Sequence, residues 1–380
     1  MENGKVQYVY CGTWSLDGRG GIGIYGYDEA SGAVTLREVV RTDVVAGLMW
    51  YDAARRVLYA IDERKNADDQ GSAGGGRVFA FSADPETGML TELNRVSSFG
   101  SLPAYITPDG TDKGILVCSH NSADSIGHVV LKEHGQYALE QVFFDTTIVH
   151  FPLREDGSLA QPDAILTFPA ERGMYACMHS VNLAPDGRTL IACDRNHDKV
   201  YRLSYEDGTL HVTDTLALER GQTMKTGACP RYSAFHPSLP LVYVNSEYQN
   251  QLRVISYEKG LSLAETCDVT PPEESGKPFS QSDLCVSADG RYLYSLYRGI
   301  DTVGVFSLNS SGMPDFSQSL HLAGKGPRGM RLSPDGRFLL VADLDTHDIT
   351  SLAVASDGTL KEVQRYVTRQ HNPGNLTFLA

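Results

Sequence analysis

Short apolar runs separated by polar turns fill the chain, and no stretch shows the periodicity of a sustained helix. One kind of run follows a turn rich in Pro, Asp and Gly, as where residues 184–188 precede the apolar segment 189–193. Proline pre-sets φ, aspartate caps the turn and glycine accepts a positive φ, so each copy predicts a turn followed by a strand. Clear copies occupy residues 107–110, 184–188, 287–291 and 333–337, and degenerate copies occupy residues 51–55 and 236–239.

A second repeated element is a hairpin turn with glycine near its centre, which usually follows alternating strand residues such as 303–308. Its seven glycines are Gly32, Gly88, Gly157, Gly208, Gly260, Gly312 and Gly358. Successive copies lie about 50 residues apart, which leaves room for about four strands in each period. This spacing is typical of the blades of a β-propeller.

The two ends of the chain complete the pattern. The first hairpin is preceded only by a predicted strand at residues 6–11, and the chain ends on another predicted strand at residues 375–379. The simplest arrangement is an all-β, closed seven-bladed propeller spanning residues 1–380, in which the C-terminal strand completes the N-terminal blade. Closure removes exposed sheet edges, which otherwise invite aggregation.

Two segments depart from the repeat. Residues 64–76 are polar and glycine-rich, and we interpret them as a surface loop because no strand–loop–helix context of a phosphate-binding loop surrounds them. Residues 121–148 form an insertion in the longest period, and residues 139–144 within it predict an added strand. Insertions of this kind are expected at the rim of a pocket or at an oligomer contact.

Charge and cysteine content narrow the classes of partner. The chain has 33 Lys and Arg against 47 Asp and Glu, a net charge of −14, which argues against nucleic acid and anionic membranes as partners. No apolar run approaches a membrane span, and no signal peptide is visible at the N-terminus, so we expect a cytoplasmic protein. The seven cysteines include no Cys-x-x-Cys and are interpreted as buried thiols in a reducing compartment. Trp14 and Trp50 are interpreted as blade-packing residues, with a platform for a sugar ring as the alternative.

Polar residues recur next to the predicted inner strands, where side chains from distant blades converge on the axis of a propeller. His179, Arg231, Asp283 and Arg328 lie at the start of such strands, and Arg195, Glu247 and Arg298 lie one strand later. Each residue alone is equally consistent with an ion pair that joins two blades. Together, several arginines at one channel mouth favour a small anionic ligand, and His179 with Glu247 favours acid–base chemistry near neutral pH.

The same residues carry a family resemblance. His179-Ser180, the Pro-Arg pair at Arg231 and Tyr297-Arg298-Gly299 resemble motifs of the seven-bladed lactonases. That family includes propeller-type 6-phosphogluconolactonases and fungal 3-carboxy-cis,cis-muconate lactonizing enzymes. The resemblance implies that His179, Arg231, Glu247 and Arg298 form the catalytic site and that Asp283 matches an acidic position common to both branches. We add Arg328, Arg195 and His120 to Asp283 as substrate-binding candidates. It implies no metal and no organic cofactor.

Some residues beside the expected site differ from the family pattern. Ser246 stands before Glu247 and Tyr297 before Arg298, where the family commonly has asparagine, and Tyr232 follows Arg231 in place of the frequent histidine. The substrate can therefore be that of either branch or a different one.

The leading hypothesis is cofactor-independent hydrolysis of a small anionic lactone. His179 would be the general base, Glu247 would position the water or shuttle its proton, and arginines would hold the anion and the oxyanion. One alternative is a lactonizing cycloisomerase that uses the same residues. A second alternative is a non-catalytic propeller that serves as an interaction scaffold, and a homo-oligomer is open in each case.

Overall fold

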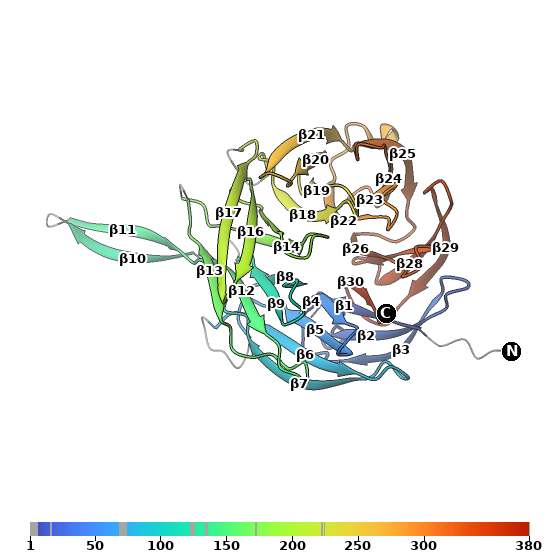
Figure 1. Ribbon diagram of the computed structural model, residues 1–380, viewed down its shortest axis with the longest axis horizontal. Helices are drawn as coiled ribbons and strands as arrows, with labels where there is room; N and C mark the ends of the chain where they lie inside the picture. The colour runs from blue at the N-terminus through green and yellow to red at the C-terminus, as the bar shows by residue number, and fades with distance from the viewer. Residues whose placement is uncertain are drawn as a thin grey trace.

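Seven four-stranded antiparallel sheets radiate from a central axis (Figure 1), so the predicted seven-bladed propeller is confirmed. The computed structural model describes residues 7–15, 17–67, 74–121, 126–133, 136–171, 173–221, 223 and 225–379. The described part of the chain contains no helix with the length and hydrophobicity needed to cross a lipid bilayer.

The four strands of each blade run from the channel outward. Blade 1 has β30 (Pro373–Phe378), β1 (Gln7–Thr13), β2 (Ile22–Tyr27) and β3 (Val34–Val40); blade 2 has β4 (Ala46–Asp52), β5 (Val57–Asp62), β6 (Arg77–Ala83) and β7 (Leu90–Ser97); blade 3 has β8 (Pro103–Pro108), β9 (Gly114–Ser119), β12 (Thr146–Pro152) and β13 (Ala164–Phe168). Blade 4 has β14 (Met178–Leu183), β15 (Leu190–Asp194), β16 (Lys199–Glu206) and β17 (Thr209–Ala217); blade 5 has β18 (Pro230–Phe235), β19 (Leu241–Ser246), β20 (Gln251–Ser256) and β21 (Ser262–Asp268). Blade 6 has β22 (Ser280–Val286), β23 (Tyr292–Arg298), β24 (Thr302–Leu308) and β25 (Pro314–His321); blade 7 has β26 (Pro327–Leu332), β27 (Phe338–Asp343), β28 (Asp348–Val354) and β29 (Leu360–Val367). A short 3-10 helix, η1 (Pro272–Glu274), lies between blades 5 and 6.

The C-terminal strand closes the ring, as the sequence predicts. β30 pairs antiparallel with β1, with Leu376 opposite Cys11. The Asn375 amide then donates hydrogen bonds to the carbonyls of Ala46 (2.7 Å) and Gly47 (2.9 Å) in blade 2. The last strand therefore completes blade 1 and joins it to blade 2.

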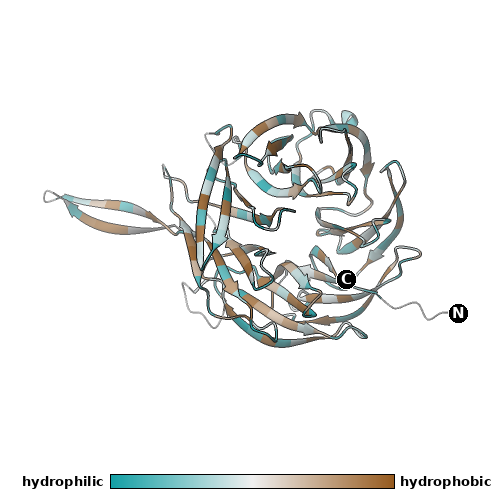
Figure 2. Ribbon diagram, viewed as in Figure 1, coloured by the Kyte–Doolittle hydropathy of each residue, from teal (hydrophilic) through white to brown (hydrophobic). Residues whose placement is uncertain are grey.

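The apolar pattern follows from the packing of one blade against the next. Strands inside a blade are covered on both faces, so β19 is buried at every position, whereas the outermost strand β29 alternates between covered and exposed residues. Figure 2 shows the resulting hydrophobic segments along the strands. The Pro-Asp-Gly turns lie before the second strand of a blade, where Asp186 accepts hydrogen bonds from the amides of Arg188 and Thr189 and Gly187 takes a φ of 70°.

A repeated tyrosine contact joins neighbouring blades. In four blades, a buried tyrosine in the second strand donates its hydroxyl to the carbonyl of the hairpin glycine between the two outer strands of the next blade. The pairs are Tyr10 with Gly88 (2.9 Å), Tyr59 with Gly157 (2.7 Å), Tyr243 with Gly312 (2.7 Å) and Tyr294 with Gly358 (3.2 Å). The glycines have φ values between 71° and 80°, which suits glycine in these hairpin turns. The hairpin glycines that repeat along the sequence are thus the acceptors of this tyrosine contact between blades.

The insertion within 121–148 forms a separate two-stranded sheet of β10 (Ile126–Glu133) and β11 (Gln136–Phe143). The added strand expected at residues 139–144 corresponds to part of β11. The hairpin projects outward from the ring, away from the channel (Figure 1), so it does not rim the central pocket, and its role as an oligomer contact stays a prediction. Of the glycine-rich segment 64–76, residues 68–73 lie outside the described residues.

We predict that Tyr243→Phe destabilises the protein by about 1–2 kcal/mol, because the buried Gly312 carbonyl loses its hydrogen-bond donor. The melting temperature measured by differential scanning calorimetry should fall by a few degrees. The matched control is Tyr137→Phe, since the Tyr137 side chain is 73% exposed. Equal melting temperatures for Tyr243→Phe and the wild type would contradict the assigned contact.

Candidate active site

Each blade contributes one equivalent residue to a ring at one mouth of the channel. Near the start of every inner strand the pairing with the second strand shifts register, for example between Met178 and Ser180 and between Pro327 and Gly329. Such irregularities re-aim the residue that the ladder skips. In blades 1 to 7 the residue at this position is Gly374, Gly47, Ala104, His179, Arg231, Ser282 and Arg328. We call this set the bulge ring.

A second set of equivalent residues lies opposite the first. In each blade, one residue of the second strand pairs with the inner strand just before the bulge, as Asp194 does with Met178 and Ser246 with Pro230. The residue that directly follows this second-strand residue in the chain belongs to the second set. In blades 1 to 7 these following residues are Trp14, Glu63, His120, Arg195, Glu247, Arg298 and Leu344. We call this set the strand-end ring. Seven of the eight residues predicted from the sequence lie in the two rings.

Glu247 is the centre of the charged cluster. Its carboxylate accepts hydrogen bonds from Arg195 (2.7 Å) and Arg298 (2.8 Å), and the Arg231 Nε lies 3.6 Å from it. Glu247 is only 4% exposed. Burial alone would raise the pKa of Glu247, but the guanidiniums of Arg231, Arg195 and Arg298 outweigh burial and lower that pKa to about 2. The group is therefore a fixed carboxylate at neutral pH.

Two histidines with opposite protonation stack beside this cluster. The rings of His120 and His179 are parallel within 2°, with centroids 5.3 Å apart. Burial and the guanidiniums of Arg231 and Arg195 lower the pKa of His179 well below its usual value, so this imidazole is neutral. Burial also acts to lower the pKa of His120, but hydrogen bonds with Cys177 and Glu63 outweigh it and raise that pKa to about 9. A neutral base therefore lies against an imidazolium.

Two residues of the cluster were not predicted from the sequence. Glu63 lies 3.3 Å from the His120 Nε2 and 3.7 Å from the Arg328 guanidinium, and it accepts a 2.6 Å hydrogen bond from the Trp14 indole. The Arg328 guanidinium lies 4.4 Å from the centroid of the Trp14 ring. Trp14 is therefore a residue of the channel mouth and not a blade-packing residue. The signal that identifies both is their position directly after a second strand, equivalent to that of Glu247.

The small members of the bulge ring have a steric role. A Cβ on Gly47 would come within 1.9 Å of the Glu63 carboxylate. Glycine at this position therefore leaves the space that Glu63 occupies.

Asp283 lies apart from this cluster. The register shift in β22 skips both Ser282 and Asp283, and Ser282 takes the bulge-ring position while Asp283 faces a separate cavity together with Arg331. The Asp283 carboxylate accepts a 2.9 Å hydrogen bond from the Met330 amide. The structure thus brings His120, His179, Arg195, Arg231, Glu247, Arg298 and Arg328 together and leaves Asp283 out.

The cluster contains several buried nitrogen atoms with no hydrogen-bond partner among the described residues. They are the Nε atoms of Arg195, Arg231, Arg298 and Arg328 and the Nδ1 of His179. Buried polar groups are nearly always hydrogen-bonded in folded proteins, so this concentration of unpaired nitrogens makes the cluster a candidate ligand-binding site. In the described parts of the chain, no three His, Cys, Asp or Glu side chains are grouped so that they would ligate a metal ion.

Comparison with known proteins gives a consistent result. Over 355 residues the chain is 27% identical to the 6-phosphogluconolactonase of Bacillus subtilis, with 90% of each chain covered. A 6-phosphogluconolactonase of Cronobacter sakazakii is 26% identical over 347 residues, also with 90% of each covered. A periplasmic gluconolactonase of Pseudomonas aeruginosa has the same fold, with a TM-score of 0.77, 23% identity and 99% of both chains covered.

The family assignment follows from the whole length of the propeller. The family model described as "Lactonase, 7-bladed beta-propeller" matches residues 8–378, which include every member of both rings. The resemblance seen in the sequence motifs is thereby confirmed, and the chain belongs to the seven-bladed β-propeller lactonase family.

Proposed function

We propose that the protein hydrolyses a small anionic sugar lactone of the 6-phosphogluconolactone type at the cluster around Glu247. The observation that carries this proposal is the set of four arginine Nε groups that have no acceptor among the described residues. Four guanidiniums and the charged His120 face the carboxylates of Glu247 and Glu63, so the cluster has an excess of positive charge. A phosphate or carboxylate on the substrate supplies both the acceptors and the charge.

His179 is assigned the role of general base. Its Nδ1 has no partner among the described residues, and its neutral state leaves a lone pair for a proton. As water adds to the lactone carbonyl, His179 takes one water proton and an arginine stabilises the oxyanion. The ring C–O bond then breaks, the proton passes to the departing ring oxygen, and a hydroxy acid is released.

Glu247 is assigned a positioning role. A carboxylate with a pKa of about 2 that already accepts two hydrogen bonds from arginines is a poor proton shuttle at neutral pH. Its charge instead holds Arg195 and Arg298 at fixed positions around the substrate. We therefore assign Glu247 to positioning arginines, which differs from the two roles considered from the sequence, positioning the water and shuttling its proton.

The cytoplasm is the proposed compartment. All seven cysteines lie among the described residues and none of them forms a disulfide there, which is typical of proteins in reducing compartments.

The test of the substrate class compares 6-phosphoglucono-δ-lactone with glucono-δ-lactone. Acid release from each lactone is measured with a pH indicator. We predict that the phosphorylated lactone has a kcat/KM at least about tenfold higher, because its phosphate supplies acceptors for the arginine Nε atoms that lack a hydrogen-bond partner among the described residues. Arg298→Met should narrow this difference. Equal kcat/KM values for the two lactones would contradict an anion-selective site. In a separate assay with a carboxymuconate, a change of ultraviolet absorbance would favour the cycloisomerase.

We predict that His179→Asn lowers kcat roughly 100- to 1000-fold with little change in KM, because the variant loses the base and keeps the arginines. The control is His211→Asn, since His211 lies exposed on β17, outside the cluster. Full turnover in His179→Asn would eliminate this residue as the base.

The pH profile tests the protonation state of His179. The base acts when it is unprotonated, so a pKa lowered below 6.5 keeps it active to more acidic pH than an ordinary histidine. We predict that kcat/KM, which reports the ligand-free enzyme, stays constant from about pH 7.5 down to about pH 6 and falls only at lower pH. An acidic limb centred near pH 7 would show that the catalytic group has an ordinary or raised pKa.

A further inference from the structure

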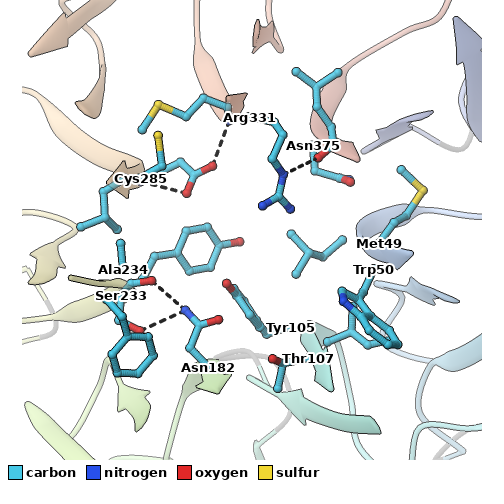
Figure 3. Close-up of a pocket in the computed structure, with 18 of the residues that line it drawn as sticks. Met49, Trp50, Tyr105, Thr107, Asn182, Ser233, Ala234, Cys285, Arg331 and Asn375 are labelled. Carbon is cyan, nitrogen blue, oxygen red and sulfur yellow. Dashed lines mark hydrogen bonds between the residues drawn. The ribbon is translucent and has the colours of Figure 1, made fainter. Parts of the chain in front are cut away.

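One half of the central channel holds a cavity whose lining includes none of the charged residues of the cluster around Glu247. Its volume is about 330 Å³, within the range of small-molecule sites. All seven inner strands, β4, β8, β14, β18, β22, β26 and β30, line it with residues that follow their bulge-ring positions. Figure 3 shows side chains from these strands converging on a common space.

Tyr232 separates this cavity from the cluster around Glu247. Its ring meets His179 edge-on at 5.2 Å on one side and Tyr105 at 5.4 Å on the other. The Arg231 guanidinium covers the Tyr232 ring at 4.3 Å. Since Tyr232 and Tyr105 both line the cavity and neither Arg231 nor His179 does, the two halves of the channel present different chemistry.

The polar groups of the cavity combine donors and acceptors with balanced charge. Asp283 accepts one hydrogen bond on each carboxylate oxygen, from the amides of Leu284 (2.8 Å) and Met330 (2.9 Å), which leaves each oxygen a further lone pair. The Arg331 Nε donates to the Leu376 carbonyl (3.3 Å), and its remaining N–H groups face the cavity (Figure 3). One carboxylate and one guanidinium thus face the space, in contrast to the positive cluster at the other mouth.

Neutral groups add further hydrogen-bonding capacity. The Asn182 amide nitrogen donates to the Ser233 carbonyl (2.7 Å) and hydroxyl (3.1 Å), so its oxygen remains available as an acceptor. Tyr105 and Thr107 bring hydroxyl groups to the same wall (Figure 3). Each of these groups is anchored by a strand of the ring, so the site is formed before a ligand binds.

The apolar part of the lining is mostly aliphatic and includes two aromatic side chains. Trp50 and Phe235 line the cavity together with Leu48. The Trp50 ring stacks on Tyr59 at 5.6 Å with a 14° interplanar angle, which fixes the orientation of its face. Aromatic faces beside mixed donors and acceptors suit the C–H face and the hydroxyl groups of a sugar ring.

We propose that this half of the channel is a second binding site, separate from the lactone site, that takes a neutral monosaccharide in its ring form. Asp283 and Arg331 bind adjacent hydroxyl groups, Asn182 and Tyr105 bind others, and the aromatic wall covers the ring. Charge balance excludes the anionic lactone as the preferred ligand of this cavity, because the one guanidinium is offset by Asp283.

The test is isothermal titration calorimetry of the full chain with D-glucose, D-galactose and D-xylose up to about 50 mM. At least one sugar should bind saturably, and Arg331→Met should weaken it about tenfold or more. Arg331 is exposed at the channel mouth, so this variant is expected to fold, and Asp283→Asn provides a second variant whose melting temperature is checked first.

The controls separate this site from the lactone site. His179→Asn should keep sugar binding while it loses lactone turnover, and Arg337→Met, at an exposed turn, should change neither. The proposal is overturned if none of the three sugars binds, if sugar binding is lost in His179→Asn, or if Arg331→Met and a folded Asp283→Asn both bind like the wild type. A failure here leaves the lactonase assay unaffected, so the two proposals fail independently.

Discussion

One buried carboxylate holds the functional mouth of the channel together. Glu247 interacts with guanidiniums from three consecutive blades, Arg195 in blade 4, Arg298 in blade 6 and Arg231 in its own blade 5. Without that carboxylate, the three guanidiniums would repel one another in a site of low dielectric constant. They would also need water molecules around them, which the buried site excludes. A structural ion pair between blades and a catalytic role are therefore not competing explanations. The same contact joins the blades and holds together the arginines that we propose to bind the anion.

This arrangement exists only because the ring closes. The strand-end ring runs from Trp14 in blade 1 to Leu344 in blade 7, and neighbours in the cluster such as Glu63 and Arg328 are far apart in the sequence. Asn375, which joins β30 to blade 2, and the tyrosine contacts between blades hold these positions at equal depth. The precision of the site thus depends on hydrogen bonds that lie outside it.

The repeat explains which features were predictable from the sequence. Hairpin glycines and Pro-Asp-Gly turns have local chemical signatures, so the blade number and the ring closure could be predicted. His179, Arg231 and Arg328 could be found because each starts an inner strand with a clear pattern. The hairpin of β10 and β11 was predicted only in part, because exposed strands such as these have a weak apolar pattern.

Other features depend on register, which composition does not encode. Asp283 lies beside the bulge-ring position, and only the register shift in β22 determines that Ser282 occupies it. Glu63 and Trp14 lie in blades 2 and 1, where the Pro-Asp-Gly turn is degenerate or absent, so their equivalence to Glu247 was hidden. A shift of one residue along a strand moves a side chain to the other face of the sheet. A bulge interrupts this alternation, so the alternating sequence pattern does not show on which face the side chain lies.

The net negative charge of the whole protein contrasts with the positive charge of the cluster around Glu247. A net charge of −14 repels an anion at long range, so the protein does not gain association rate from its overall field. Salt screens that repulsion beyond about 10 Å at 0.1 M, whereas contacts inside a buried site are screened much less. The proposed selectivity for an anion therefore depends on contacts within the channel, at the positive cluster at one mouth. The balanced pair of Asp283 and Arg331 at the other half has no such excess, and this contrast separates the two halves of one channel by chemistry as well as by the wall of Tyr232.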